Sequence, residues 1–170
     1  SSSSSSKNSA VERCVAILDL MSTQGFHPTK SLFQNVLSEV ANIKGCTVLE
    51  PNNGNHGVRN VPAEYTIVLQ AYRRAGYKIT TRLLNQLLFV HICNFQGPES
   101  LLASRGVVRG MLRRGIQEKQ TSLQEGQLHK ASQPDHFTVK NIQSLVSLSV
   151  RDPEMVQLQA ELERYMEGQD

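Results

Sequence analysis

The chain has 170 residues and a mass of 18.9 kDa, which is enough for one domain. At this size a fold hides roughly 70% of its extended-chain surface, so its core requires neither disulfides nor a metal. Aromatic residues make up only 5% and Trp is absent, which excludes a Trp-anchored β-sandwich. No apolar run approaches the roughly 18 residues of a membrane span, so we expect no membrane partner.

Cysteine usage and the N-terminal segment indicate an intracellular fragment. Cys14, Cys46 and Cys93 are odd in number and have no C-x-x-C spacing, so we expect reduced thiols. The chain begins with a run of Ser rather than Met, and this run has the features of neither a signal nor a transit peptide. We therefore expect a piece of a larger intracellular protein, cytoplasmic or nuclear, with a mitochondrial location left open.

The net charge of +3 hides an asymmetry along the chain. Residues 1–150 carry 16 Lys and Arg against 9 Asp and Glu, whereas residues 151–170 carry 2 against 6. Between Arg59 and Arg114 there are nine bases and only two acids. This middle stretch suits phosphate or an acidic partner.

Apolar residues recur with helical spacing in seven segments, and no segment shows convincing strand alternation. The sequence therefore predicts an all-α fold of antiparallel helix pairs, stacked as a short helical-repeat array. Gly and Pro residues set the boundaries. The predicted helices begin at Ala10 (ending before Gly25), at Thr29 or Ser31 (ending at Lys44-Gly45), at Pro62 (to about Ala75), at Thr80 (to Asn94), at Glu99 (to about Arg114), at Pro134-Asp135, and at Asp152-Pro153 (to Gly168).

The segments between these helices define the expected domain organisation. Residues 1–9 are a Ser-rich linker that we expect to be disordered, and residues 167–170 are a tail. One α-helical repeat domain spans 10–166. Its two predicted loop insertions are Asn- and Gly-rich at about 45–61 and Gln-rich at about 115–134, and long insertions of this kind often carry binding residues.

The junction between the first two predicted helices resembles the pentatricopeptide repeat. Met21, Gly25, Phe26, Pro28 and Phe33 stand where that family has a helix end, a turn and an aromatic near the next helix start. The resemblance implies stacked helix pairs, and its degenerate copies cover most of residues 10–166. A tetratricopeptide-like array and an unrelated helical bundle are the alternatives. Three further segments match the repeat less closely: Tyr65 to Gly76, Met111 to Gly115-Ile116 (a helix end) and Pro134 to Thr138 (a helix start).

The same resemblance implies contact with single-stranded RNA through the residue that follows the aromatic of each repeat. By position this residue is Gln34 after Phe33, and Lys140 after Val139. In the middle copy it is Val68, which cannot hydrogen-bond a base. The departure argues against a sequence-specific code.

Basic side chains supply the other candidate contacts. Arg105, Arg109 and Arg113 recur every four residues and so share one helix face. Such a face can follow phosphates, dock an acidic partner or simply be solvated. The acidic last helix offers a further alternative, since it can pack against the basic residues or cap the array. The full set of candidate contacts is Arg73, Arg74, Lys78, Arg82, Arg105, Arg109, Arg113 and Arg114.

No motif indicates catalysis. The five His residues form no H-x-x-x-H pair and none has a metal-binding spacing with Cys, and no phosphate-binding or nucleophile motif occurs. We therefore expect no enzyme, no cofactor, no metal and no small-molecule substrate. The predicted function is a non-catalytic protein–protein interaction scaffold. The alternative is a single-stranded RNA-binding module that uses the basic face.

Overall fold

The computed structural model describes residues 10–43, 60–125 and 132–168, and in these ranges all regular structure is α-helical. The all-α prediction is therefore confirmed. The predicted linker at 1–9 and nearly all of the predicted loop at 45–61 lie outside the described residues. The described residues divide into two compact units, one up to Lys78 and one from Ile79 onward. The single domain over 10–166 stays a prediction.

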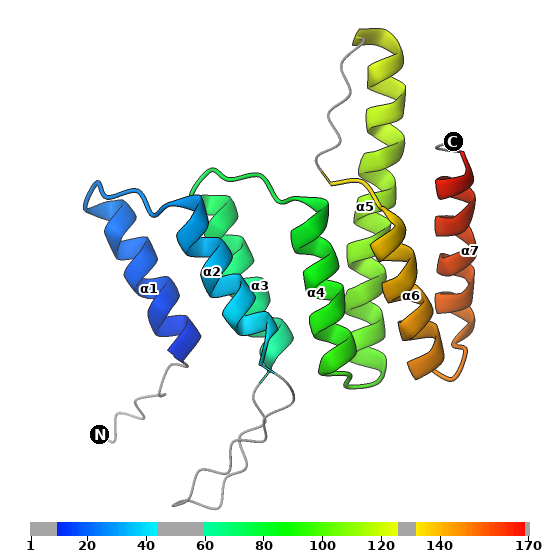
Figure 1. Ribbon diagram of the computed structural model, residues 1–170, viewed down its shortest axis with the longest axis horizontal. Coiled ribbons are helices and arrows are strands. Elements are labelled where there is room, and N and C mark those ends of the chain that lie inside the picture. The colour runs from blue at the N-terminus through cyan, green and yellow to red at the C-terminus, as the bar shows by residue number, and fades with distance from the viewer. Residues whose placement is uncertain (1–9, 44–59, 126–131, 169–170) are drawn as a thin grey trace, which may run out of the picture. The chain divides into compact units, whose positions relative to one another are not determined.

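The first unit contains α1 (Ala10–Thr23), α2 (Lys30–Ala41) and α3 (Val61–Arg74). Within it α3 packs against both other helices, and α2 runs opposite to α1 and α3 (Figure 1). Helices α1 and α2 run antiparallel, as their short connection indicates, but they are not the main packing pair of this unit. Instead α3 is the common partner, since its buried positions lie on two sides of the helix, at Val61, Tyr65, Val68, Leu69, Ala71 and Tyr72.

An aromatic cluster holds α2 against α3 and the turns beside them. The Tyr72 ring meets Phe33 edge-on at a centroid distance of 5.8 Å and stacks on Tyr77 at 5.1 Å. The Tyr77 hydroxyl donates a hydrogen bond to the Pro28 carbonyl oxygen at 2.8 Å. Burial, and then the neighbouring Tyr77, raise the pKa of the Tyr72 hydroxyl. These rings therefore form the tightly packed centre of the first unit.

The connections after α1 and after α3 have the same local geometry. Gly25 and Gly76 both adopt positive φ angles, +83° and +92°, which glycine tolerates without strain. In both, the next residue returns its N–H to the last turn of the helix. Four residues after each glycine a threonine, Thr29 or Thr80, caps the following helix with its side-chain oxygen.

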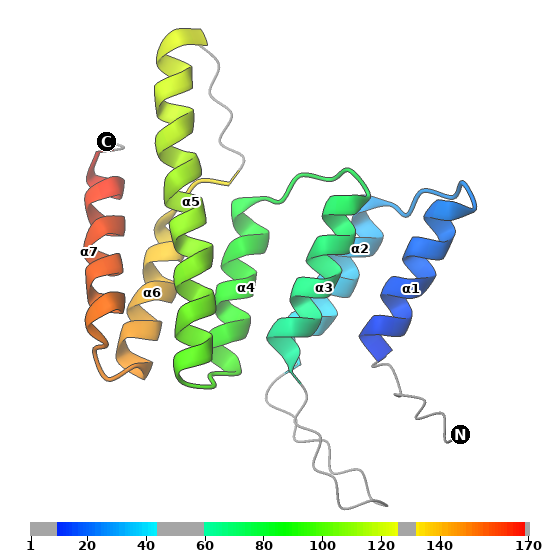
Figure 2. The ribbon, with the colours of Figure 1, turned by 180° about the vertical axis from the view of Figure 1, so that it is seen from behind.

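The second unit contains α4 (Thr81–Cys93), α5 (Pro98–Glu125), α6 (His136–Leu148) and α7 (Pro153–Glu167). The helices form two hairpins, α4 with α5 and α6 with α7. The hairpins pack with equivalent helices together, α4 on α6 and α5 on α7. Figures 1 and 2 show α4 and α6 running in one direction and α5 and α7 in the other. Stacked antiparallel pairs are therefore present in this unit.

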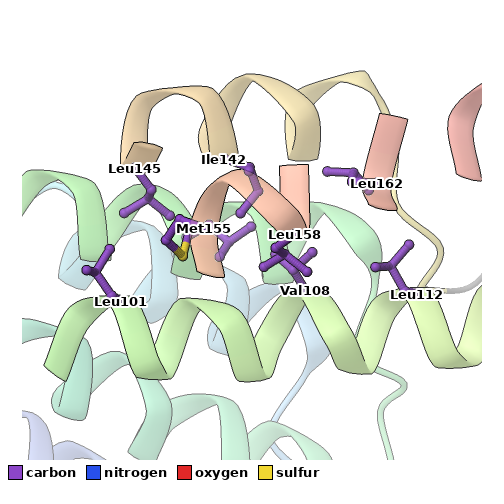
Figure 3. Close-up of a cluster of buried hydrophobic side chains, with 9 residues drawn as sticks. Leu101, Val108, Leu112, Ile142, Leu145, Met155, Leu158 and Leu162 are labelled. Carbon is purple, nitrogen blue, oxygen red and sulfur yellow. The ribbon is translucent and has the colours of Figure 1, made fainter. Parts of the chain in front are cut away.

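The core of the second unit lies where α5, α6 and α7 converge (Figure 3). Leu88 adds a contact from α4. None of these side chains is more than 8% exposed, so the unit has a dry apolar centre. The other members of the cluster are Leu101, Val108 and Leu112 of α5, Ile142 and Leu145 of α6, and Met155, Leu158 and Leu162 of α7.

The predicted insertion at 115–134 is wrong over much of its length, because α5 continues as a helix to Glu125. Gly115, interpreted as a helix end, lies buried within α5. A Cβ atom at Gly115 would collide with the Tyr165 ring of α7. The Lys119 ammonium group lies 4.8 Å from the centre of that ring and donates to the Gly168 carbonyl oxygen at 3.1 Å. Packing on α7 thus stabilises a helical extension that has few apolar residues of its own.

Candidate functional site

A groove of about 590 Å³ lies between α4 and α6, within the second unit. The helices run side by side in the same direction there, so each contributes one row of side chains. The groove is lined by Arg82, Asn85, Gln86 and Phe89 of α4, Phe137, Lys140 and Asn141 of α6, and Asp135, the N-cap of α6.

A polar network around Asn85 fixes the spacing of the two helices. The Asn85 Nδ2 group donates to Asp135 Oδ1 at 2.8 Å, and its Oδ1 accepts from the Thr138 hydroxyl at 2.8 Å. The Asn141 Nδ2 group donates to the Asn85 backbone carbonyl oxygen at 3.2 Å. Asn85 is only 8% exposed and Thr138 is fully buried, so these bonds form away from water. The groove therefore has a rigid, hydrogen-bonded floor.

The start of α6 is held by the same network. Asp135 Oδ1 accepts from the backbone N–H groups of Phe137 and Thr138, while the Asp135 N–H donates to the Thr138 hydroxyl. This is a capping box. Nearby, the Thr81 hydroxyl donates to the Gln133 carbonyl oxygen at 2.6 Å. The Asp135 carboxylate already accepts several hydrogen bonds, and its negative charge is partly offset by them.

Two phenylalanines stand exposed on opposite sides of the groove. Phe89 of α4 is 47% exposed and Phe137 of α6 is 54% exposed. The Phe137 ring lies 4.0 Å from the His136 ring, centre to centre, and 5.9 Å from the Lys140 ammonium nitrogen. Two exposed aromatic rings beside one groove are typical of a docking surface, where aromatic residues are enriched.

The rim of the groove is basic. Arg82 and Lys140 are both exposed and belong to different helices. Asp135 is the only acidic residue among the lining side chains, and its carboxylate is engaged in the α6 cap. An approaching ligand therefore meets two exposed cations beside the two phenylalanine rings.

The three arginines predicted to share one face of α5, which are Arg105, Arg109 and Arg113, differ in their exposure. The Arg105 side chain is only 16% exposed and pairs with Glu154 of α7, with Asp152 Oδ1 at 3.9 Å from its Nη1. The expectation that the acidic last helix packs against the basic residues is confirmed at Arg105. Arg109 and Arg113 are exposed on α5.

The remaining basic candidates are divided between the two units. Arg73, Arg74 and Lys78 are exposed in the first unit, and Arg74 pairs with Asp19 at 3.1 Å. Arg82 lies in the groove of the second unit. Arg114 is exposed at the surface of α5, beside Gly110.

The residues that the pentatricopeptide resemblance implies as base-reading positions lie in different units. Lys140 lies in the groove, whereas Gln34 is partly buried on α2 in the first unit. Its neighbour Phe33 is 1% exposed and packs in the aromatic cluster. Val68 is fully buried in α3.

Sequence reasoning did not single out Phe89 or Phe137 as candidate binding residues. A signal for Phe89 was present in the spacing. Arg82, Gln86 and Phe89 recur at intervals of four and three residues, which puts them on one helix face. The buried leucines of α4, including Leu84 and Leu88, occupy a different face.

Burial lowers the pKa of His91. It lies on the buried side of α4 at 7% exposure. Its Nδ1 atom has no hydrogen-bond partner in the part of the chain that the structure describes. Across those residues, no group of three or more His, Cys, Asp or Glu side chains is arranged to hold a metal ion.

Searches against protein-family models, curated proteins and solved structures find no match to this chain. The pentatricopeptide resemblance therefore stays a prediction. No helix within the described ranges has the length and apolar character to cross a membrane.

Proposed function

We propose that this chain is a non-catalytic helical module that holds a protein partner, and that the groove between α4 and α6 is its binding site. The observation that carries the proposal is the pair of exposed rings, Phe89 and Phe137, across a groove whose floor is rigid. Aromatic anchors presented by a preorganised surface supply much of the binding free energy in protein interfaces.

The chemistry of the lining supports binding over catalysis. The groove residues are amides, two bases, two phenylalanines and one carboxylate that caps a helix. None of these lining residues carries a hydroxyl, thiol or imidazole group that would act as a nucleophile or a general base near neutral pH.

We also propose that the chain is built from repeats of the pentatricopeptide-like kind. The matching turns after Gly25 and Gly76, each leading to a capping threonine, support this. A second regularity lies in α3, α5 and α7, which pair with α2, α4 and α6 and all have Pro in their first turn. Each pair would thus be one repeat unit.

The alternative partner is single-stranded RNA, and the observation that favours it is the exposure of Arg109 and Arg113 one turn apart on α5. Arg105, the first member of that face, is paired with α7. The RNA proposal therefore rests on two arginines of the original three.

Photocrosslinking tests the proposed function. Phe89 is replaced by p-benzoylphenylalanine, and the control carries the same photoreactive residue at Phe26, which is 68% exposed in the first unit. We expect protein adducts from position 89 that are absent from position 26 and survive RNase. Adducts at neither position, or adducts only to RNA, would overturn the proposal.

A further inference from the structure

We infer that the α4–α6 groove takes an acidic peptide segment that carries one large apolar side chain. The inference rests on the proposed function and adds the chemistry of the partner. Charge complementarity and the arrangement of the two rings argue for this occupant.

The apolar part of the ligand follows from the two phenylalanines. Phe89 and Phe137 expose about half of each side chain, at 47% and 54%, and come from different helices. A Leu, Met or Phe side chain inserted between them would remove apolar surface from water on both sides. The volume of about 590 Å³ holds such a side chain together with part of the backbone on either side of it.

The acidic character follows from the rim. Arg82 and Lys140 are exposed on opposite helices, so carboxylates on either side of the apolar anchor would each meet a cation. The lining still carries an excess of one positive charge, because Asp135 is the one carboxylate beside these two cations, and hydrogen bonds hold it at the start of α6. Rim charges of this kind steer association and select the partner.

A peptide backbone can also find hydrogen-bond partners here. Asn141 uses one N–H of its amide to contact the Asn85 carbonyl oxygen. The amide group has a second N–H and a carbonyl oxygen, which match the acceptor and donor of a peptide unit. The hydrogen-bonded floor keeps Asn141 in place before the ligand arrives.

The ring geometry favours a peptide over RNA. Base recognition on single strands relies on stacking against an open aromatic face. The Phe137 ring lies 4.0 Å from the His136 ring, with Lys140 at 5.9 Å from its centre. The tilted His136 ring therefore covers part of the Phe137 ring, which leaves less open aromatic surface at Phe137 for a stacked base.

Selection from a phage-displayed library of random linear peptides tests the inference with the full chain as bait. We expect enriched peptides to contain Asp and Glu around one large apolar residue. Phe89→Ala and Phe137→Ala should each weaken such a peptide by about tenfold or more, while Phe26→Ala leaves it unchanged. Lys140→Glu should shift the selection toward basic residues, and Arg73→Glu in the first unit should not.

The outcomes separate the two proposals. Peptides that depend on Phe89 and Phe137 but lack acidic residues would overturn the inference and leave the groove as a protein site. Peptides that bind equally well to both Phe→Ala variants would overturn both. Failure to enrich any peptide would overturn the inference, and mixed-sequence single-stranded RNA binding that requires Arg82 and Lys140 would replace both proposals.

Discussion

The Asn85 side chain donates to the Asp135 carboxylate at 2.8 Å, joining the second turn of α4 to the N-cap of α6 across 50 residues of sequence. This bond links the N-cap of α6 to the residue that sets the spacing of α4 and α6. Asp135 starts α6, and Asn85 sets the distance between the helices that form the groove. Loss of Asn85 therefore affects both folding and the site.

We expect Asn85→Ala to lower the free energy of unfolding by about 1–3 kcal/mol, because it removes two buried 2.8 Å hydrogen bonds and leaves the Thr138 hydroxyl with only a longer contact to Asp135 Oδ1 at 3.3 Å. Urea denaturation measures the loss. The control is Gln143→Ala, at an exposed position on α6, which should change stability little. A similar midpoint for both variants would contradict the network.

Asn85→Asp keeps the shape of the side chain but adds a negative charge, so it tests the effect of charge alone at this position. The new carboxylate would face Asp135, and their repulsion would raise the pKa of one carboxyl group in the folded state. A raised folded-state pKa favours the fold at low pH and costs stability as the pH rises through it. We expect the penalty, measured against wild type, to be larger near pH 7 than near pH 4.

Gly115 and Tyr165 give a second test of packing. We expect Gly115→Ala to destabilise the second unit by about 1–3 kcal/mol, since the new methyl group would collide with the tyrosine ring. Gly106→Ala is the matched control on the same helix, where a Cβ meets nothing within 4 Å. It should stabilise α5 by up to about 1 kcal/mol.

A double-mutant cycle assigns the Gly115 effect to its neighbour. In a Tyr165→Ala background the cost of Gly115→Ala should shrink, because the colliding ring is gone. An unchanged cost would mean that α5 and α7 do not approach closely there.

Because His91 is buried, we expect the free energy of unfolding to depend on pH. Burial lowers its pKa in the folded state below the unfolded value of about 6.5, so the fold favours the neutral ring. Stability is therefore full above that value and falls as the pH drops toward the folded pKa. His91→Phe should flatten the change in urea midpoint between about pH 7.5 and pH 5.5, while His136→Gln, at an exposed position, should not.

Arg105 and Arg109 should behave differently although they lie one turn apart. Arg105→Ala removes a pair to Glu154 at the start of α7, and we expect a loss of about 0.5–1 kcal/mol that decreases with added salt. Arg109→Ala, at an exposed position, should be nearly neutral. Equal losses in thermal unfolding would contradict the assignment of Arg105 to α7.

Local sequence signals predicted the helices well. Thr29 caps α2, Pro62 lies in the first turn of α3, and Gly168 follows α7, all as their residue types indicate. These boundaries depend on nearby residues only, so a single sequence contains the information. Helix α2 ends earlier than predicted, at Ala41, and the predicted end at 44–45 lies outside the described residues.

The errors came from contacts between distant residues. Gly115 indicated a helix end, but its role depends on Tyr165, which lies 50 residues later. The packing of α2 on α3 likewise joins helices across a long connection, and local signals do not predict it. The sequence alone does not single out Phe137, because apolar residues usually are buried, and its exposure follows from the placement of α6 against α4.

An NMR titration with an acidic peptide that carries a central Leu tests the groove most directly. We expect chemical-shift changes at the side-chain amides of Asn85 and Asn141 and at the rings of Phe89 and Phe137, all lost in Phe89→Ala. Changes confined to residues outside the groove, or none at saturating peptide, would contradict binding between α4 and α6.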